Sequence, residues 1–279
     1  MSTNQNTSGN LPPEPAPVRL IEKHKVIYAK RVRGLFDNWR VGMVFLTQAI
    51  FYGGLWLEWN DRQALLFHLV ERKFYIFGLV FWPQDVIYLA ILLIVSAYGL
   101  FLVTAIAGRL FCGYACPQTV YTQCFMWIEN WVEGDRNARL KLDKAPMDAR
   151  KLRLRITKHG LWLLIAIWTA ITFVGYFTPI RELLPTVFSF ETGPWEAFWL
   201  LFYAAFTYVQ AGLAREAVCQ HMCPYSRFQG VMFDPTTANV SYDHQRGEPR
   251  TKAGDCIDCG ICVQVCPTGI DIRDGLQLA

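Results

Sequence analysis

The chain has 279 residues, of which 53% are apolar and only 18% are charged, and its formal net charge is +4. This composition is more apolar than that of most soluble domains. The positive charge lies in a few loops and is not interleaved with base-stacking aromatic residues, which argues against nucleic-acid binding. The nine cysteines are an odd number, and eight of them fall in three tight clusters, which argues against a secreted disulfide framework.

The N-terminal 40 residues are predicted to precede the first membrane span. Residues 1–17 are polar and rich in proline, which predicts a disordered tail. Residues 18–40 form a basic segment with seven Lys or Arg side chains. We expect this segment to be cytoplasmic, because basic residues next to spans stay on the cytoplasmic side.

Four apolar runs are predicted to cross a membrane as helices. They are Val41–Leu57, Val86–Ala107, Leu161–Ile180 and Trp195–Ala214. The second run is the clearest, since it has 22 residues and no charge, enough to span a bilayer core. Residues 60–84 contain two apolar pieces that are too short to span, and we interpret both as interfacial. The expected fold class is mainly α, a polytopic membrane bundle of four transmembrane helices occupying residues 41–230.

The loop 132–158 sets the expected orientation of this bundle. It carries nine Lys or Arg and four Asp or Glu side chains. The positive-inside rule therefore predicts that both this loop and the N-terminus are cytoplasmic. With four spans, the C-terminal segment also returns to the cytoplasm, and every cysteine cluster lies on the reducing side. The predicted location is the bacterial inner membrane, with lipid as a partner.

The sequence contains an internal repeat that ends in paired cysteines. Cys112 and Cys116 precede Pro117, and Cys219 and Cys223 precede Pro224, 107 residues further on. Proline favours the first turn of a helix, so the second cysteine of each pair is expected at or next to an N-cap, where the helix dipole favours the thiolate.

Thiolates are soft ligands that select Cu(I), so these four cysteines are candidate catalytic, redox or copper-binding residues. A redox disulfide remains an alternative to copper binding. His221 and Met222 lie between the second pair and could add ligands, whereas Cys124 is interpreted as a packing residue.

A ferredoxin-type motif lies near the C-terminus. Cys256, Cys259, Cys262 and Cys266, followed by Pro267, fit the spacing C-x2-C-x2-C-x3-C-P of proteins that bind 4Fe-4S clusters. A zinc site is the alternative, but zinc sites usually add histidines or a second C-x2-C pair. In two-cluster ferredoxins the fourth cysteine ligates the other cluster, so residues 231–279 are expected to form a partial ferredoxin-like domain.

Together, four separated motifs resemble the CcoG/FixG/RdxA family of bacterial accessory proteins for assembly of the cbb3-type cytochrome c oxidase. The motifs are Gly108–Val120, Trp127–Asp135, the Cys219–Cys223 pair followed by Tyr225–Gln229, and the ferredoxin motif. The resemblance implies two 4Fe-4S clusters and a cupric reductase that delivers Cu(I). It also implies copper chaperones or transporters and oxidase assembly factors as partners. Family members continue with a second ferredoxin motif, a fifth span and a periplasmic β-sandwich, so the resemblance predicts C-terminal truncation here.

Two other functions remain open at this stage. The chain could be an electron-transfer subunit that takes electrons from quinol and feeds a respiratory reductase. It could also be a non-catalytic assembly scaffold with a structural cluster. The electron donor is expected to be a cytoplasmic protein or a quinol, because the sequence has no nucleotide-binding motif.

Overall fold

The computed structural model describes residues 28–30, 34–60, 62–234, 236–248, 254–266 and 271–274. The predicted N-terminal tail and most of the basic segment 18–40 lie outside the described residues, as does Pro267 of the ferredoxin motif. The described part of the chain is mostly helical, which confirms the expected class.

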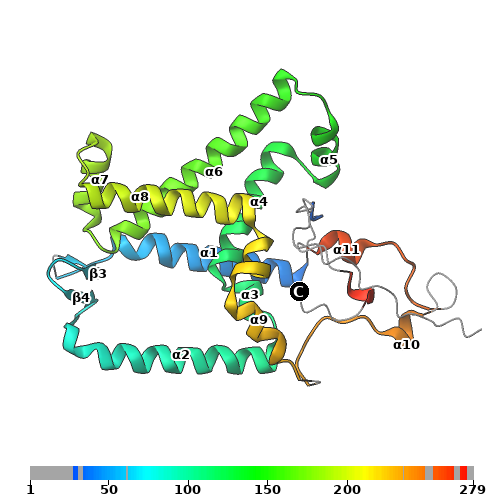
Figure 1. Cartoon of the computed structure of the whole chain (residues 1–279), viewed down its shortest axis with the longest axis horizontal. Helices are drawn as coiled ribbons and strands as arrows, with labels where there is room; N and C mark the ends of the chain where they lie inside the picture. The colour runs from blue at the N-terminus through cyan, green and yellow to red at the C-terminus, as the bar shows by residue number, and fades with distance from the viewer. Residues whose placement is uncertain are drawn as a thin grey trace, which may run out of the picture.

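Helices α1 (Leu35–Gly53), α2 (Val86–Ala107), α6 (Ala149–Gly175) and α8 (Pro194–Thr207) form the body of the molecule. Figure 1 shows α1, α2 and α8 with roughly parallel axes, and α6 inclined to them. Three described helices are long and apolar enough to cross a membrane: Pro83–Ala107, Ala149–Gly175 and Pro194–Ala214. Helix α1 has 19 residues and is not among them. Three of the four predicted spans therefore correspond to candidate membrane spans, and the remaining one does not.

Helix α2 has apolar side chains on every face. None of its apolar window is buried inside the described structure. A helix that is apolar all round must be surrounded by lipid or protein. By contrast, α6 packs along α8 and α4 (Pro117–Glu133), and it carries most of the buried side chains.

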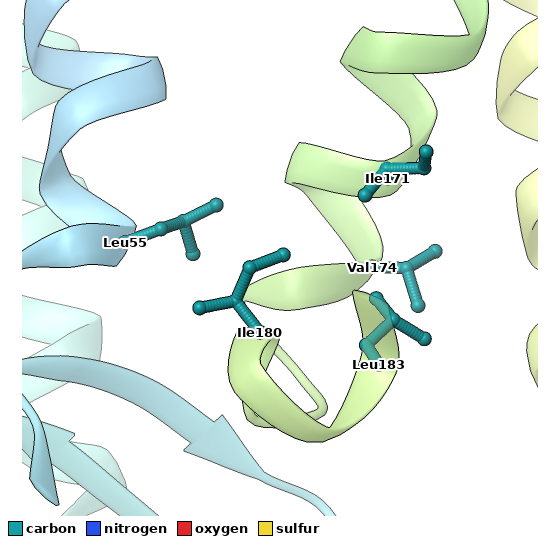
Figure 2. Close-up of a cluster of buried hydrophobic side chains, with 5 residues drawn as sticks. All are labelled: Leu55, Ile171, Val174, Ile180 and Leu183. Carbon is teal, nitrogen blue, oxygen red and sulfur yellow. The ribbon is translucent and has the colours of Figure 1, made fainter. Parts of the chain in front are cut away.

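One core cluster joins the ends of α1, α6 and α7 (Ile180–Ser189). Leu55 follows α1 and points toward Ile180, while Ile171 and Val174 project from α6 beside Leu183 (Figure 2). The approach is close: a Cβ at residue 175 would lie 2.9 Å from the Cδ1 atom of Ile180, so the Ile180 side chain would have to shift to admit one.

The segment between α1 and α2, where two short interfacial pieces are predicted, forms antiparallel strands, and its interfacial placement stays a prediction. Strands β3 (Leu65–His68), β4 (Lys73–Ile76) and β5 (Leu79–Phe81) form an antiparallel sheet in that order, and β1 (Glu58–Trp59) pairs with β2 (Arg62–Gln63). The two apolar runs, Ala64–Val70 and Phe74–Trp82, are rich in aromatic and aliphatic residues, which favour strands. A turn at Arg72 separates the runs and a turn at Phe77 divides the second one, and both residues have positive φ. Phe67 and Phe74 face each other across the sheet with ring centroids 5.9 Å apart.

The loop predicted at 132–158 is also corrected, because most of it is helical. Helix α5 spans Arg136–Lys144, and α6 begins at Ala149, where the carboxylate of Asp148 accepts a 2.8 Å hydrogen bond from the Ala149 amide. The basic residues 149–158 are thus the first turns of the third predicted span, which starts 12 residues before the predicted Leu161. It ends at Gly175 rather than Ile180, because the chain turns there before Pro179.

The short helices α3 (Leu110–Tyr114), α9 (Pro224–Val231), α10 (His244–Gly247) and α11 (Ile261–Val265) complete the fold. Figure 1 places them, with α4 and α5, at the end of the bundle opposite the strands and α7. The three cysteine clusters therefore gather at one end of the molecule, as the predicted topology requires.

Candidate redox site

The second cysteine of each pair lies at a helix start, as predicted. Pro117 is the first residue of α4 and Cys116 is its N-cap residue. Pro224 is likewise the first residue of α9, with Cys223 as the N-cap residue. Both cysteines have extended backbone angles, which is the usual conformation of an N-cap.

The two motifs also share their local hydrogen bonds and backbone turns. The Thr119 hydroxyl donates to the Cys112 carbonyl at 2.6 Å, and the Ser226 hydroxyl donates to the Cys219 carbonyl at 2.5 Å. Four residues before the first cysteine of each motif, Gly108 and Arg215 have nearly the same angles, φ 57° and ψ −115° against φ 41° and ψ −114°. The sequence repeat is therefore a structural repeat.

Each repeat donates a hydrogen bond to the backbone turn that precedes the cysteine pair of the other repeat. The Gln118 side chain, on α4, donates to the carbonyl of Arg215 at 3.0 Å, and the Gln229 side chain, on α9, donates to the carbonyl of Gly108 at 3.3 Å. The Tyr225 hydroxyl also hydrogen bonds to the Thr104 hydroxyl at the end of α2. These reciprocal contacts bring the two cysteine pairs to a common location.

The four cysteines are close enough for their charges to interact. Burial raises the pKa of Cys112, and the neighbouring Cys116 and Cys223 raise it further. Burial, with contributions from Cys116, Cys223 and Cys112, raises the pKa of Cys219 to about 11. All four side chains are free and partly exposed. Within the described residues, no three His, Cys, Asp or Glu side chains are arranged to hold one metal ion, so binding would require the thiols to close together.

Gln229 contacts the first cysteine directly. Its side chain is buried, and its amide nitrogen lies 3.7 Å from the Sγ atom of Cys112, with the amide oxygen at 3.9 Å. An amide can accept from a thiol or donate to a thiolate, so Gln229 suits either protonation state.

A buried charge cluster that sequence reasoning missed fixes the second motif against α4. The carboxylate of Glu129 lies 2.9 Å from both Arg139 and Arg215, and 3.5 Å from Lys158. Lys158 also lies 2.8 Å from the Glu133 carboxylate, and the same Glu133 oxygen lies 3.5 Å from Arg155. The available signal was a charged residue inside the stretch Phe125–Trp131, in which Asn130 is the only other polar residue.

The ion pairs keep Glu129 charged despite its burial. Burial alone would raise its pKa, but Arg215, Arg139 and Lys158 outweigh this effect, and the pKa is lowered. Since Arg215 lies four residues before Cys219, Glu129 links the charge cluster to the cysteine site.

The ferredoxin motif begins as a loop and continues into helix α11, which contains Cys262. Asp258 and Gly260 have positive φ, which turns the backbone between Cys256 and Cys262, and Arg273 lies near Cys262. Four thiolates at this spacing are a donor set that fits a 4Fe-4S cluster, although the side chains are not closed around one point.

Residues 28–30 connect this loop to α5. The Lys30 amide donates to the Gln264 carbonyl at 2.8 Å, while Arg136 and Arg139 donate to the carbonyls of Tyr28 and Ala29. The charge cluster and the ferredoxin loop are therefore joined through Arg139. His221 and Met222 are exposed and have no described contact with the paired cysteines.

Comparison with known proteins defines the class. The 4Fe-4S dicluster domain family matches residues 214–253 and 249–279, and the 4Fe-4S binding domain family matches residues 89–138. With the apolar helices and the cysteine motifs, these matches define a membrane-bound iron–sulfur electron-transfer protein.

Individual relatives then identify the family. The nitrogen fixation protein FixG of Rhizobium meliloti is 41% identical over 275 residues, covering 93% of this chain and 52% of FixG. The proteins RdxB and RdxA of Cereibacter sphaeroides are 42% and 39% identical, covering 93% and 91% of this chain and 58% and 56% of their own lengths. The chain belongs to this FixG/RdxA family, and it spans about half the length of these relatives. No solved structure is significantly similar to it.

Proposed function

We propose that this protein reduces Cu(II) to Cu(I) at the paired cysteines, in support of assembly of a cbb3-type cytochrome c oxidase. Cu(II) is the substrate and Cu(I) the product, and a copper chaperone or transporter would accept the product. The protein would lie in the bacterial inner membrane with the cysteine-bearing end in the cytoplasm. The relatives support an iron–sulfur redox role, and one of them is named for nitrogen fixation.

The observation that carries the copper proposal is the reciprocal packing of the two repeats. Gln118 and Gln229 each hold the turn that precedes the opposite cysteine pair. Four partly exposed thiols from distant parts of the chain thereby meet, and soft thiolate ligands stabilise Cu(I) over Cu(II). Such a site favours the reduced ion and so helps to drive the reduction.

Cys256, Cys259, Cys262 and Cys266 would hold a 4Fe-4S cluster, with Cys266 able to serve a second cluster as in two-cluster ferredoxins. When bound, such a cluster supplies one-electron transfer. The chain's own residues orient it, since residues 28–30 tie α11 to α5.

A second candidate function is supported by the positions of the family matches. The 4Fe-4S binding domain match at 89–138 contains Cys112 and Cys116, and the dicluster match from 214 contains Cys219 and Cys223. Four thiolates can also ligate an iron–sulfur cluster, in which case the paired cysteines would carry electrons without binding copper.

Cu(II) reduction by anaerobically purified protein tests the proposal directly. A Cu(I)-specific chelator would report the product after the protein is reduced. The double substitution Cys116→Ala with Cys223→Ala is expected to abolish copper reduction and leave iron content unchanged. Cys124→Ala, on the same helix as Cys116, is the matched control and should retain activity. Retained copper reduction in the double variant refutes the copper site, and a loss of iron in that variant assigns the pairs to a cluster.

A further inference from the structure

A cavity of about 390 Å³ lies between α1, α4, α6 and α8, next to the first cysteine pair. Its volume is within the range of roughly 300–1,000 Å³ that small-molecule sites usually have. Two of the helices that line it, α6 and α8, belong to candidate membrane spans. A molecule that reaches this cavity therefore comes most directly from the lipid phase.

The walls of the cavity suit a flat ring. Phe51, Phe173, Tyr203 and Phe206 supply aromatic surface, with the rings of Phe173 and Tyr203 at a centroid distance of 4.1 Å. Aromatic walls favour offset or edge contacts with another ring. A saturated acyl chain would gain nothing from such geometry beyond burial.

One part of the wall is polar. Gln48, Tyr121 and Thr169 all line the cavity and lie near one another. The Thr169 hydroxyl is 2.9 Å from the Tyr52 hydroxyl, which extends this polar group behind the wall. Hydroxyl and amide groups inside an apolar cavity provide donors and acceptors for the oxygen atoms of a ring.

The cavity also reaches the redox site. Ala115 and Pro117 line it, and Cys116 is the residue between them. Gln118 and Gln210 line the same region, and the Gln118 amide donates to the Gln210 carbonyl at 3.0 Å, which joins α4 to the π-helix Tyr208–Ala214 that continues α8. A ring held here would lie next to the N-cap cysteine of α4.

We propose that this cavity binds a lipid-soluble quinol, which is the electron donor to the paired cysteine site. The inference rests on the proposed copper reduction and adds its reductant. One quinol loses the two hydrogen atoms of its O–H bonds as two protons and two electrons and becomes a quinone. The electrons reduce two Cu(II) ions to two Cu(I) ions in successive one-electron steps, and the protons pass to water.

Binding of decylubiquinol to the full chain in lipid nanodiscs tests the site. The substitution Tyr121→Phe removes one hydroxyl from the polar wall, and we expect the Kd for decylubiquinol to rise about tenfold, as for the loss of one hydrogen bond to a ligand. Phe206→Trp places a larger ring in the cavity and should abolish binding. Tyr98→Phe makes the same chemical change as Tyr121→Phe on the exposed surface of α2 and should leave the Kd unchanged.

The outcomes separate this inference from the copper proposal. If decylubiquinol does not bind, or binds equally to all three variants, the quinol site is wrong, even where dithionite-reduced protein still converts Cu(II) to Cu(I). A phospholipid that stays in the cavity and excludes decylubiquinol, detected by native mass spectrometry, also overturns it. Variant-sensitive quinol binding without copper reduction supports the cavity and refutes the copper proposal.

Discussion

Replacement of Glu129 by Gln should separate the two cysteine pairs. Glu129 is the only carboxylate that contacts Arg215 among the ion pairs of the described residues, and its side chain is 8% exposed. The substitution keeps the size of the side chain but leaves Arg139, Lys158 and Arg215 with one carboxylate fewer in a buried setting. Breaking a buried ion pair by removing one partner costs about 3–5 kcal/mol. For a chain of this size that corresponds to a fall in Tm of roughly 6–20 °C.

Glu133→Gln is the matched control. Glu133 is also buried and contacts Lys158 at 2.8 Å, but it does not contact Arg215. Both variants should therefore lower the Tm, whereas only Glu129→Gln should release the second motif. A short bifunctional thiol reagent, with linked peptides identified by mass spectrometry, measures the proximity of the two motifs. Cross-links between them should fall several-fold in Glu129→Gln and persist in Glu133→Gln. Equal cross-linking in the two variants would refute the positioning role of Glu129.

Three further results are expected. The pKa of Glu129 is lower in the folded protein than its ordinary value of 4.5, so the charged carboxylate stabilises the fold fully above pH 4.5, and this stabilisation is lost as the pH falls further. The Tm measured from pH 6 to pH 3 should therefore drop more steeply in the native chain than in Glu129→Gln. Gly212→Ala places a Cβ atom 3.0 Å from a buried indole and should destabilise the protein by about 1–3 kcal/mol in thermal unfolding, whereas Gly113→Ala, which has open space, should not. Gln229→Leu leaves a buried carbonyl without its donor, at a cost of about 1–3 kcal/mol, and maleimide labelling should show faster modification of Cys112.

The sequence predicts those features that depend on local chemistry. Proline has no amide hydrogen and a fixed φ, so Pro117 and Pro224 mark helix starts regardless of what surrounds them. The run Val86–Ala107 predicts its helix to the residue, because 22 apolar residues without a charge have few alternatives. The spacing of the ferredoxin cysteines indicates the class of cofactor before any fold is known.

The sequence predicts less well what depends on partners far along the chain. The strands of residues 58–81 form because short apolar pieces pair with each other, which a search for spans does not reveal. The basic residues 149–158 look like a solvated loop, yet Lys158 is buried against Glu129 and Glu133, which lie on a different helix. Arg155 and Lys158 therefore belong to the first turns of α6 and not to a loop between α5 and α6.

The equivalent turns of the two repeats carry different residues, Gly108 and Arg215. This difference explains why Glu129 is needed to position the second cysteine pair. Gly108 must be glycine, because a Cβ there would lie 2.9 Å from the Ala238 carbonyl oxygen in a backbone conformation with φ 57°. Arg215 adopts nearly the same conformation with a full side chain, and positive φ costs a residue other than glycine about 1–2 kcal/mol. The ion pair with Glu129 and the stacking of the guanidinium over Trp162, 5.5 Å from the ring centre, offset that cost. A glycine at 215 would relieve the backbone strain but remove the anchor, so Arg215→Gly should resemble Glu129→Gln in the cross-linking assay. An improved Tm with intact cross-links would show instead that the turn alone positions Cys219.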